Sequence, residues 1–453
     1  MFAEVVLYLF IPLAIGVFFV ARPLPAALFV ILAGVMFLPV GVSFHIPFVP
    51  GIDKENLPYL CVLIGCLLRC PGRVTKLPKE RWFLVISLVL IVGGVGTALT
   101  NSDSIPIGRG RGLFLPGMTF KDGMATALSQ LLNNCVTFYI GFALCRGEED
   151  IEKLLAGLAI AGLVYSPFAM YEARMSPQLH GMFYGFNNAD FFQTRRWGGF
   201  RPMVCMPHGL ALARFFVATN LALFVLARIR RRLMGIPVGP LAWFQAVVLV
   251  LCKSTGAIFL AFVGVLVIKF VSPKRQLTIA AAIGLVTVAY PILRGAELFP
   301  VTSLLDAAGE VQEERAGSLH FRFVNEDILL ERARERIVFG WGTYGRNRTY
   351  NDKGENAVIT DGYWIMVLGT SGIIGFLGAF GTLALPLFWA RRRLQSHGDS
   401  RDKRILAGLA VILALVSVDL IPNGLWSYYP YLLAGALSRR ARELRPTSEI
   451  GET

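Results

Sequence analysis

The sequence predicts an all-α polytopic integral membrane protein with about 12–13 transmembrane helices. Hydrophobic residues make up 55% of its 453 residues and charged residues only 16%, whereas a soluble domain carries about a quarter charged residues. Apolar runs of about 20 residues, the length that crosses a bilayer, recur along the chain. Backbone groups inside a bilayer must be hydrogen-bonded within their own segment, and no run alternates as a barrel strand does. These runs are therefore predicted to be helices.

The apolar segments follow one another from the first residues to the last helix. The predicted spans are 2–20, 24–43, 57–68, 82–100, 123–145, 154–171, 208–227, 241–252, 255–271, 277–294, 363–390, 405–421 and 424–438. One pair is ambiguous, because Lys253 interrupts the run between residues 241 and 271. This pair is either two short helices that form a hairpin or one long kinked helix.

The spans divide the chain into four parts. We predict a transmembrane bundle with short outer loops over 1–294, a large periplasmic loop over 295–362, C-terminal transmembrane helices over 363–440 and a cytoplasmic tail over 441–453.

Basic residues in short loops predict the orientation of the helices in the membrane. Clusters at alternate helix ends are assigned to the cytoplasm, at 69–81, 146–153, 228–232, 274–275, 391–393 with 401–404, and 439–442. The C-terminus then lies inside and Met1 outside. The net charge of +14 reflects this topology and anionic lipid headgroups, so no nucleic-acid partner is expected.

The predicted outer loops break the rule that such loops are poor in arginine. These arginines are Arg109, Arg111, Arg174, Arg195, Arg196, Arg201, Arg315, Arg322, Arg332, Arg334, Arg336, Arg346 and Arg348. Clustered arginine binds phosphate or carboxylate through its planar fork. The alternative is pairing with acidic neighbours in the same loop. Pairing fits the segment 331–336, where Glu331 and Glu335 alternate with arginine, better than it fits Arg195, Arg196 and Arg201.

The large loop is predicted to contain a helix that lies in the membrane interface over the bundle. Four apolar residues fall on one helical stripe, namely Phe323, Leu330, Ala333 and Ile337. Gly340-Trp341-Gly342 ends the helix. Glu326 falls within the stripe and Arg322 lies one turn before it. A buried carboxylate is costly unless paired, so the sequence leaves two roles open, an Arg322–Glu326 structural pair or substrate binding.

Asp361 lies directly before the first turn of the span 363–390, at its predicted outer end. An Asp in this position is commonly the N-cap of the helix. It is also well placed to act on a substrate at the membrane surface, and the two roles do not exclude each other. Gly369, Gly372, Gly375 and Gly378 give the helix a face of small residues that permits close contact.

Three motifs lie in order in the predicted outer segments. The first is Arg196-Trp197-Gly198-Gly199-Phe200-Arg201-Pro202, followed by Pro207-His208-Gly209 at the start of a helix. The second is Leu251-Cys252-Lys253-Ser254-Thr255-Gly256-Ala257. The third is Asp361-Gly362, nine residues, then Gly372-Ile373-Ile374-Gly375. Together they resemble the O-antigen ligase and polymerase superfamily, over about residues 171–378. Asp361 stands where that family usually has His, and Thr255 where its turn has Arg, with Lys253 nearby.

The resemblance implies a GT-C-like membrane glycosyltransferase of the bacterial inner membrane, with its active site facing the periplasm. Such an enzyme transfers a glycan from an undecaprenyl-pyrophosphate-linked donor onto an acceptor sugar hydroxyl, as a ligase or as a polymerase, during surface polysaccharide synthesis. Its partners are the lipid-linked donor, a saccharide or glycolipid acceptor, membrane lipids and other polysaccharide assembly or export proteins.

We assign roles to seven residues on this basis. Arg196, Arg201 and Arg322, with Lys253 as a fourth candidate, are expected to stabilise the pyrophosphate leaving group. An acceptor hydroxyl needs a positioned base, for which Asp361 is the first choice, Glu326 the second and His208 the third. No cofactor or metal ion is expected, since the outer loops carry no Asp-x-Asp or His-rich motif.

Two other classes of protein would also use arginine at a membrane. A transporter or flippase for an anionic lipid or solute places arginine in a membrane cavity, but it typically shows two similar halves with broken helices at matching positions. No such halves are visible in the sequence. A structural partner of a polysaccharide export machine is the third possibility.

Overall fold

The structure is a computed structural model that describes residues 2–45, 50–75, 81–108, 112–187, 191–311, 313–395 and 397–444. Met1, Arg109, Arg111, the side chain of Arg315 and the predicted tail from residue 445 onward lie outside the described part of the molecule.

The described chain is mostly helical. They are α1 (Phe2–Val20), α2 (Pro23–Phe37), α3 (Leu57–Arg69), α4 (Pro71–Val74), α5 (Arg81–Leu99), α6 (Phe120–Gln130), the π-helix η1 (Leu131–Val136), α7 (Thr137–Leu144), α8 (Glu148–Met175), α9 (Leu179–Tyr184), α10 (Phe191–Thr194), α11 (Gly209–Ala227), α12 (Val238–Leu251), α13 (Thr255–Phe270), α14 (Pro273–Gly295), α15 (Val301–Val311), α16 (Glu313–Arg334), α17 (Tyr363–Leu394), α18 (Arg401–Val418) and α19 (Tyr429–Glu443). Four short antiparallel hairpins join them, β1 (Ser43–Phe44) with β2 (Ile52–Asp53), β3 (Ile105–Ile107) with β4 (Leu113–Leu115), β5 (Arg195–Arg196) with β6 (Gly199–Phe200), and β7 (Arg232–Leu233) with β8 (Ile236–Pro237).

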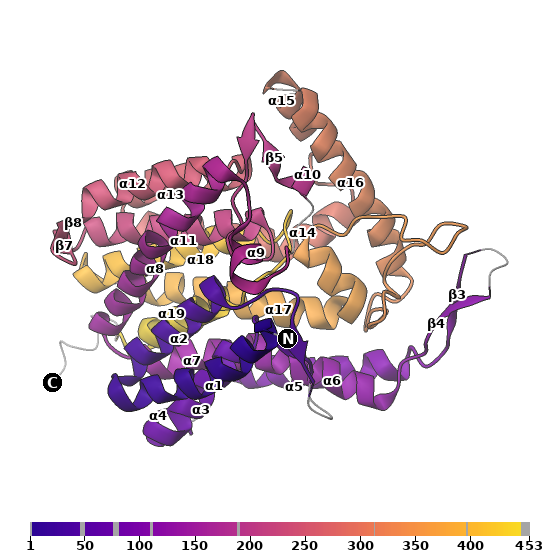
Figure 1. The fold of residues 1–453 in the computed structure, drawn as a ribbon, viewed down its shortest axis with the longest axis horizontal. Helices are drawn as coiled ribbons and strands as arrows, with labels where there is room; N and C mark the ends of the chain where they lie inside the picture. The colour runs from indigo at the N-terminus through magenta and orange to yellow at the C-terminus, as the bar shows by residue number, and fades with distance from the viewer. Residues whose placement is uncertain are drawn as a thin grey trace.

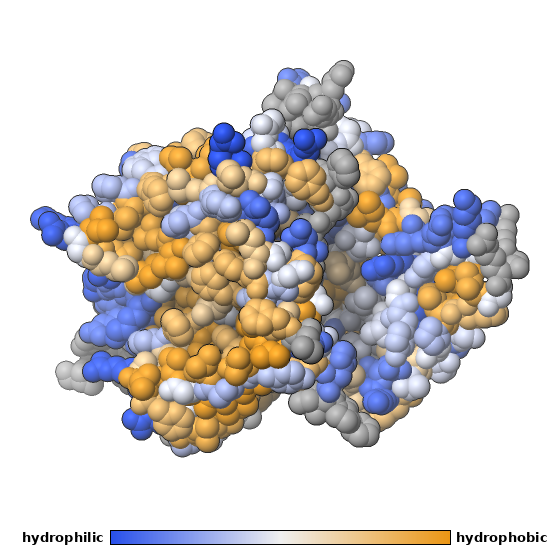
Figure 2. All heavy atoms as spheres, in the orientation of Figure 1, coloured by the Kyte–Doolittle hydropathy of each residue, from blue (hydrophilic) through white to orange (hydrophobic). Residues whose placement is uncertain are grey.

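Within the described residues, seven helical segments are long and apolar enough to cross a membrane. They are α1, α5, the continuous run from α6 to α7, α8, α11, α14 and α17. The predicted helical class is therefore confirmed, and the helices are compatible with a polytopic membrane protein. Hydrophobic side chains gather over α1, α8 and α12, as Figure 2 shows, and hydrophilic ones lie toward the margins.

The loops and helix ends fall into two groups at opposite ends of the bundle (Figure 1). One group, here called the loop end, contains the described residues of segments 100–119, 176–208, 252–254, 296–362 and 419–428. At this end Arg336 forms an ion pair with Asp103, with Nη2 3.3 Å from Oδ2. At the opposite end Arg230 pairs with Glu152, with Nη1 3.4 Å from Oε1. These contacts join predicted outer segments to one another and predicted cytoplasmic segments to one another.

Residues 241–271 form a hairpin of two short helices, the first of the two predicted alternatives. The hairpin starts at the C-terminal end of α11, where the Val238 amide donates to the Arg231 carbonyl. It reverses at Lys253, which has a positive φ of 50° and lies at the loop end. It then returns to the C-terminal end of α11, where the Arg228 guanidinium donates to the Ile268 carbonyl.

Three predicted helix boundaries that lie near prolines are wrong. The span 24–43 ends early, at Phe37, because Pro39 disfavours a helical conformation at the residue before it. The spans 405–421 and 424–438 end at Val418 and begin again at Tyr429. Pro422 cannot continue a helix, and the stretch 419–428 instead crosses the loop end as an irregular segment.

Helix α17 is broken at Gly372, which has φ 64° and ψ −167°. Residues 337–342 run along the break, where the Trp341 amide donates to the Gly369 carbonyl at 2.8 Å and the Ile373 amide to the Ile337 carbonyl at 2.7 Å. A Cβ at Gly372 would overlap the carbonyl of Val338. The glycine pair of the third motif therefore begins at a position that only glycine fits, for both conformation and space.

The large loop contains two helices, α15 and α16. The predicted stripe on α16 is buried at Phe323, Leu330 and Ala333, whereas Ile337 lies beyond the helix and is 39% exposed. The helix packs on α17, and Figure 1 shows α15 projecting beyond the other helices at this end.

Candidate functional site

Two of the predicted arginines are presented by the hairpin β5–β6. Its turn residues Trp197 and Gly198 have φ of 49° and 65°, the conformation of a tight two-residue β-turn. Arg196 lies opposite Gly199 in the register. Arg201 follows directly, with its amide donating to the Thr194 carbonyl at 2.7 Å. The turn therefore fixes the spacing of the arginines before Pro202.

The turn between α12 and α13 joins this hairpin. The Arg201 Nη2 donates to the carbonyl of Lys253 at 3.1 Å. The Lys253 side chain lies against the hairpin, since a Cβ at Gly199 would overlap its Nζ. Two motifs that are 52 residues apart in sequence thus meet at the loop end, and the glycine of the first motif leaves room for the lysine of the second.

His208 is the N-cap of α11 and lies against the segment 419–428. Its Nδ1 accepts from the Leu210 amide at 3.1 Å, and its ring stacks on Trp426 at 5.6 Å between centroids. Burial, and then the positive charges of Arg201, Arg322 and Arg196 in that order, lower the pKa of His208 to about 4. The imidazole is therefore neutral at neutral pH and a weak base, and it lies close enough to all three guanidinium groups to be affected by them.

Arg322 enters the site from α16 and pairs with Asp361. Its Nε lies 3.3 Å from Asp361 Oδ2, and its Nη1 donates to the Pro422 carbonyl at 3.3 Å. The Arg322 side chain is 31% exposed and that of Asp361 40%. The N-cap of α17 is Gly362, without a side-chain cap bond, so the predicted capping role of Asp361 is wrong.

The cluster of Arg196, Arg201 and Arg322 carries excess positive charge. Burial, and then the charges of Arg196 and Arg322, lower the pKa of Arg201 to about 10. The buried Nε of Arg201 has no hydrogen-bond partner among the described residues. Asp361 is the carboxylate that pairs with the cluster. An arrangement of this kind attracts an anion with several oxygens, such as a pyrophosphate.

Glu326 belongs to a different cluster, on the buried side of α16. Its carboxylate accepts from Tyr290 Oη and Trp364 Nε1, both at 3.1 Å, and lies 3.6 Å from Arg294 Nε. The predicted Arg322–Glu326 pair is therefore wrong, because Arg294 of α14 is the partner of Glu326. Burial raises the pKa of Glu326, and Trp364, Arg294 and Tyr290 oppose this rise.

The segment 419–428 contacts several residues of the site. The sequence pattern predicts it as parts of two helices. Besides Pro422 and Trp426, it provides Asp419, which forms a buried ion pair with Arg214 at 3.0 Å. Arg214 also donates to the Gly424 carbonyl. The signal in the sequence was an ionisable residue inside an apolar run, which in a membrane protein commonly marks a functional region.

A second acidic residue that the sequence pattern did not single out is Glu55, two residues before the start of α3. Burial, and then the charge of Asp53, raise the pKa of Glu55 to about 7. The neighbouring Lys54 is buried and donates to the carbonyls of Leu38 and Cys205. This contact holds residues 50–56 against the stretch that joins Arg201 to His208. An acidic residue before a predicted span, as at Asp361, was the available signal.

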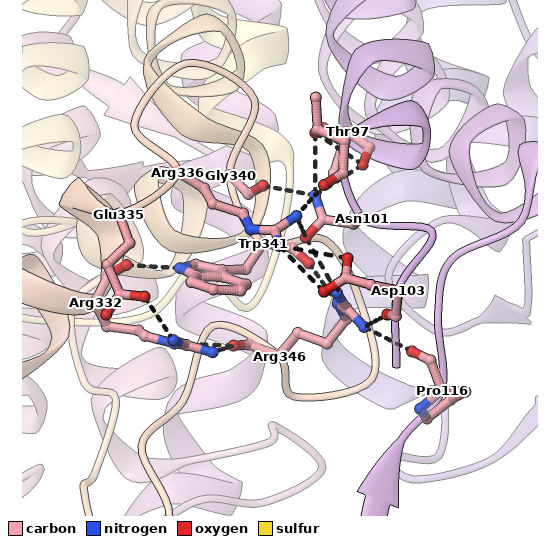
Figure 3. A network of polar contacts seen from close by, with 11 residues as sticks. Thr97, Asn101, Asp103, Pro116, Arg332, Glu335, Arg336, Gly340, Trp341 and Arg346 are labelled. Carbon is pink, nitrogen blue, oxygen red and sulfur yellow. Dashed lines mark hydrogen bonds and ion pairs between the residues drawn. The ribbon is translucent and has the colours of Figure 1, made fainter. Parts of the chain in front are cut away.

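A second group of arginines at the loop end consists of Arg332, Arg336 and Arg346, and their guanidinium groups contact other parts of the protein (Figure 3). The guanidinium groups of Arg332 and Arg336 lie over the Trp341 ring, 3.4 and 4.4 Å from its centroid. Arg346 is fully buried and donates to the carbonyls of Asp103 at 2.7 Å, Pro116 at 2.9 Å and Trp341 at 3.2 Å. These residues tie the long loop to segment 101–116 and have a structural role.

The predicted pairing of the segment 331–336 with its own acidic residues holds for one of its arginines. Arg332 Nη1 lies 2.8 Å from Glu335 Oε2. Arg336 pairs instead with Asp103 in another loop, and Arg334 donates to the carbonyl of Gly295 at 2.6 Å.

The structure thus brings Arg196, Arg201, Arg322, His208 and Asp361 together. Lys253 lies against the hairpin β5–β6, and Glu326 lies in a separate cluster on the buried side of α16. In the part of the chain that is described, no three His, Cys, Asp or Glu side chains converge as a metal site would require.

Neither a scan against models of known protein families nor a search of curated proteins finds a match to this chain.

Proposed function

We propose that this protein is a membrane glycosyltransferase that transfers or polymerises a glycan from an undecaprenyl-pyrophosphate-linked donor onto an acceptor sugar hydroxyl. One observation carries the proposal: the positive charges of Arg196, Arg201 and Arg322 all act on His208, and Asp361, the carboxylate paired with Arg322, is about two-fifths exposed. An anion-binding group and a candidate base thus occupy one site at the end of a helical bundle.

The proposed reaction assigns a separate task to each group. The acceptor oxygen bonds to the anomeric carbon while the bond between that carbon and the pyrophosphate oxygen breaks. The pyrophosphate keeps the bonding electron pair, and Arg201, Arg196 and Arg322 stabilise its increased charge. The acceptor proton passes to Asp361. His208, already an N-cap and held neutral, positions the loop beside the arginines.

The setting of the proposed enzyme follows from its topology. We place the loop end in the periplasm and the opposite end in the cytoplasm of a bacterial inner membrane, because the basic clusters of short loops gather at the opposite end. A GT-C-like arrangement, with an active site between outer loops and transmembrane helices, fits the position of the arginines. Other polysaccharide assembly or export proteins would supply the donor and remove the product.

A transporter or flippase of an anionic lipid is the second candidate, and the break of α17 at Gly372 favours it. The two functions differ in their product. An enzyme releases polyprenyl pyrophosphate from a sugar-bearing donor, whereas a flippase moves the donor across the bilayer unchanged. Elongated lipid-linked chains would indicate a polymerase, and transfer to a second acceptor a ligase.

The test measures binding of undecaprenyl pyrophosphate without a sugar to the purified protein, so that it does not depend on the glycan. Arg201→Lys keeps the charge but loses the planar fork. A charged hydrogen bond is worth roughly 1.5–3 kcal/mol, so we expect affinity to fall about tenfold or more. Arg334→Ala is the matched control and should bind as the native protein does. Unchanged affinity in Arg201→Ala would remove this residue from the site.

A further inference from the structure

A second cluster of arginines lies at the opposite end of the bundle, around a cavity of about 350 Å³. The cavity is lined by Arg81 and Trp82 at the start of α5, Trp389 and Arg393 near the end of α17, and Ser438 and Arg442 on α19. Its volume lies within the range of small-molecule sites, roughly 300–1,000 Å³. No predicted site residue is among those that line it.

The lining is cationic and aromatic. Three arginines from three helices contribute to it, and within the described residues no acidic side chain lines it. The nearest acidic residue along α19, Glu443, is engaged elsewhere, with Oε1 2.7 Å from Arg439 Nη2 and Oε2 3.7 Å from Arg440 Nη1. The cavity is therefore positively charged and attracts an anion.

Arg393 is held in place beside this cavity. Its Nη1 donates to the Arg442 carbonyl at 3.2 Å, and its guanidinium carbon lies 5.6 Å from the centroid of the Trp389 ring. Trp389 itself is 37% exposed. Tryptophan is enriched at the level of lipid headgroups, where its apolar ring and polar N–H face different surroundings.

The surface next to the cavity is apolar. Leu84, Val85 and Leu88 follow Arg81 at helical spacings of three, four and seven residues, so they share its face of α5. They are 47%, 56% and 60% exposed. A cationic cavity that continues into an exposed apolar stripe matches a molecule with an anionic head and hydrocarbon chains.

We infer that this cavity binds the phosphate headgroup of an anionic phospholipid, with the acyl chains lying along the exposed face of α5. The phosphate is held by Arg81, Arg393 and Arg442, and the two tryptophans contact the glycerol region. Free phosphate has the same charged group but would gain nothing from the apolar stripe. The inference does not depend on the proposed transferase activity, because it concerns the other end of the bundle.

The experiment measures lipid binding to the full-length protein in detergent by native mass spectrometry, with phosphatidylglycerol as the probe. An arginine that contacts an anionic lipid headgroup contributes a factor of about five in affinity. The double variant Arg81→Gln with Arg393→Gln should therefore bind phosphatidylglycerol about 25-fold more weakly. Arg391→Gln is the matched control, since Arg391 is exposed on the same helix and does not line the cavity; it should bind within about twofold of the native protein.

Two further arms identify the ligand. Phosphatidylcholine, whose phosphate is balanced by a choline cation, should bind at least tenfold more weakly than phosphatidylglycerol, and inorganic phosphate at equal concentration should not displace the lipid. Equal binding of the double variant and the native protein would overturn the site. Displacement by inorganic phosphate would show an anion site without lipid preference, and equal binding of phosphatidylcholine would show an apolar groove without anion preference; either result contradicts the inference.

Discussion

Replacing Asp361 by Asn separates a catalytic carboxylate from one that only pairs with Arg322. The substitution keeps the shape of the side chain and removes its charge. The pair is partly exposed, at 40% for Asp361 and 31% for Arg322, and an ion pair of this kind contributes at most about 1 kcal/mol. Gly362, not Asp361, is the helix N-cap. We therefore expect the unfolding temperature to change by no more than about 3 °C.

The kinetic effect depends on the role of the carboxylate. If Asp361 accepts the proton of the acceptor, kcat should fall by roughly a hundredfold or more. The KM for the donor should stay the same or fall, because the loss of one negative charge leaves Arg322 free for the pyrophosphate. If Asp361 only orients Arg322, donor binding suffers first, so KM should rise while kcat changes little.

The assay follows release of polyprenyl pyrophosphate at several donor concentrations, with the protein in liposomes. Glu331→Gln is the matched control, because it removes the same charge from an exposed position on α16 and should change neither constant. Asp361→His then asks whether the residue of the resembling family restores transfer. A kcat within threefold of the native value in Asp361→Asn would refute the assignment of this carboxylate as the base.

Three other expectations follow from the same contacts. The pKa of His208 is about 4 in the folded protein and about 6.5 in the unfolded chain, so stability that is present above pH 6.5 should be lost as the pH falls toward 4. His208→Asn can still cap α11 and should reduce this loss of stability in acid, measured by unfolding scans at several pH values. Arg346→Met leaves several carbonyls without a donor and should destabilise the protein by about 3 kcal/mol or more, measured by denaturant unfolding, and a neutral result would contradict its structural role. A reporter fused after Arg393 should read as cytoplasmic and one near Lys353 as external, and the reverse result would invalidate the proposed orientation.

The helices could be predicted because an apolar run of sufficient length has few alternatives to a helix in a membrane. The segment 419–428 could not. Leu420 and Ile421 extend the apolar run, so local hydropathy continues the helix through them. Pro422 prevents the helix from continuing past it. The path of the segment, however, depends on partners distant in sequence, namely Arg214 for Asp419 and Arg322 for the carbonyl of Pro422. A hydropathy profile contains no information about these contacts.

Helical spacing correctly predicts that Glu326 lies on the buried face of α16, but it predicts the wrong ion-pair partner. Residues 322 and 326 are one turn apart, which permits contact, but the structure directs Arg322 toward Asp361 and Glu326 toward Arg294, 32 residues earlier. The long side chain of arginine reaches several acceptors from one backbone position. Periodicity therefore predicts which side of a helix is buried more reliably than it predicts which ion pair forms there.

Counting acidic neighbours in the sequence separates functional from structural arginines only in part, because backbone carbonyls can also accept the hydrogen bonds of a buried arginine. Arg346 has no adjacent acidic residue, yet three carbonyls and Asp103 occupy its guanidinium. Arg201 differs because, within the described residues, its guanidinium donates to one carbonyl, that of Lys253, and its charged neighbours Arg196 and Arg322 repel its own charge. Repulsion among like charges raises the free energy of this cluster, and a bound pyrophosphate would lower it. The unfavourable charge arrangement is thus the physical reason for assigning this cluster, and not that of Arg332, Arg336 and Arg346, to the substrate.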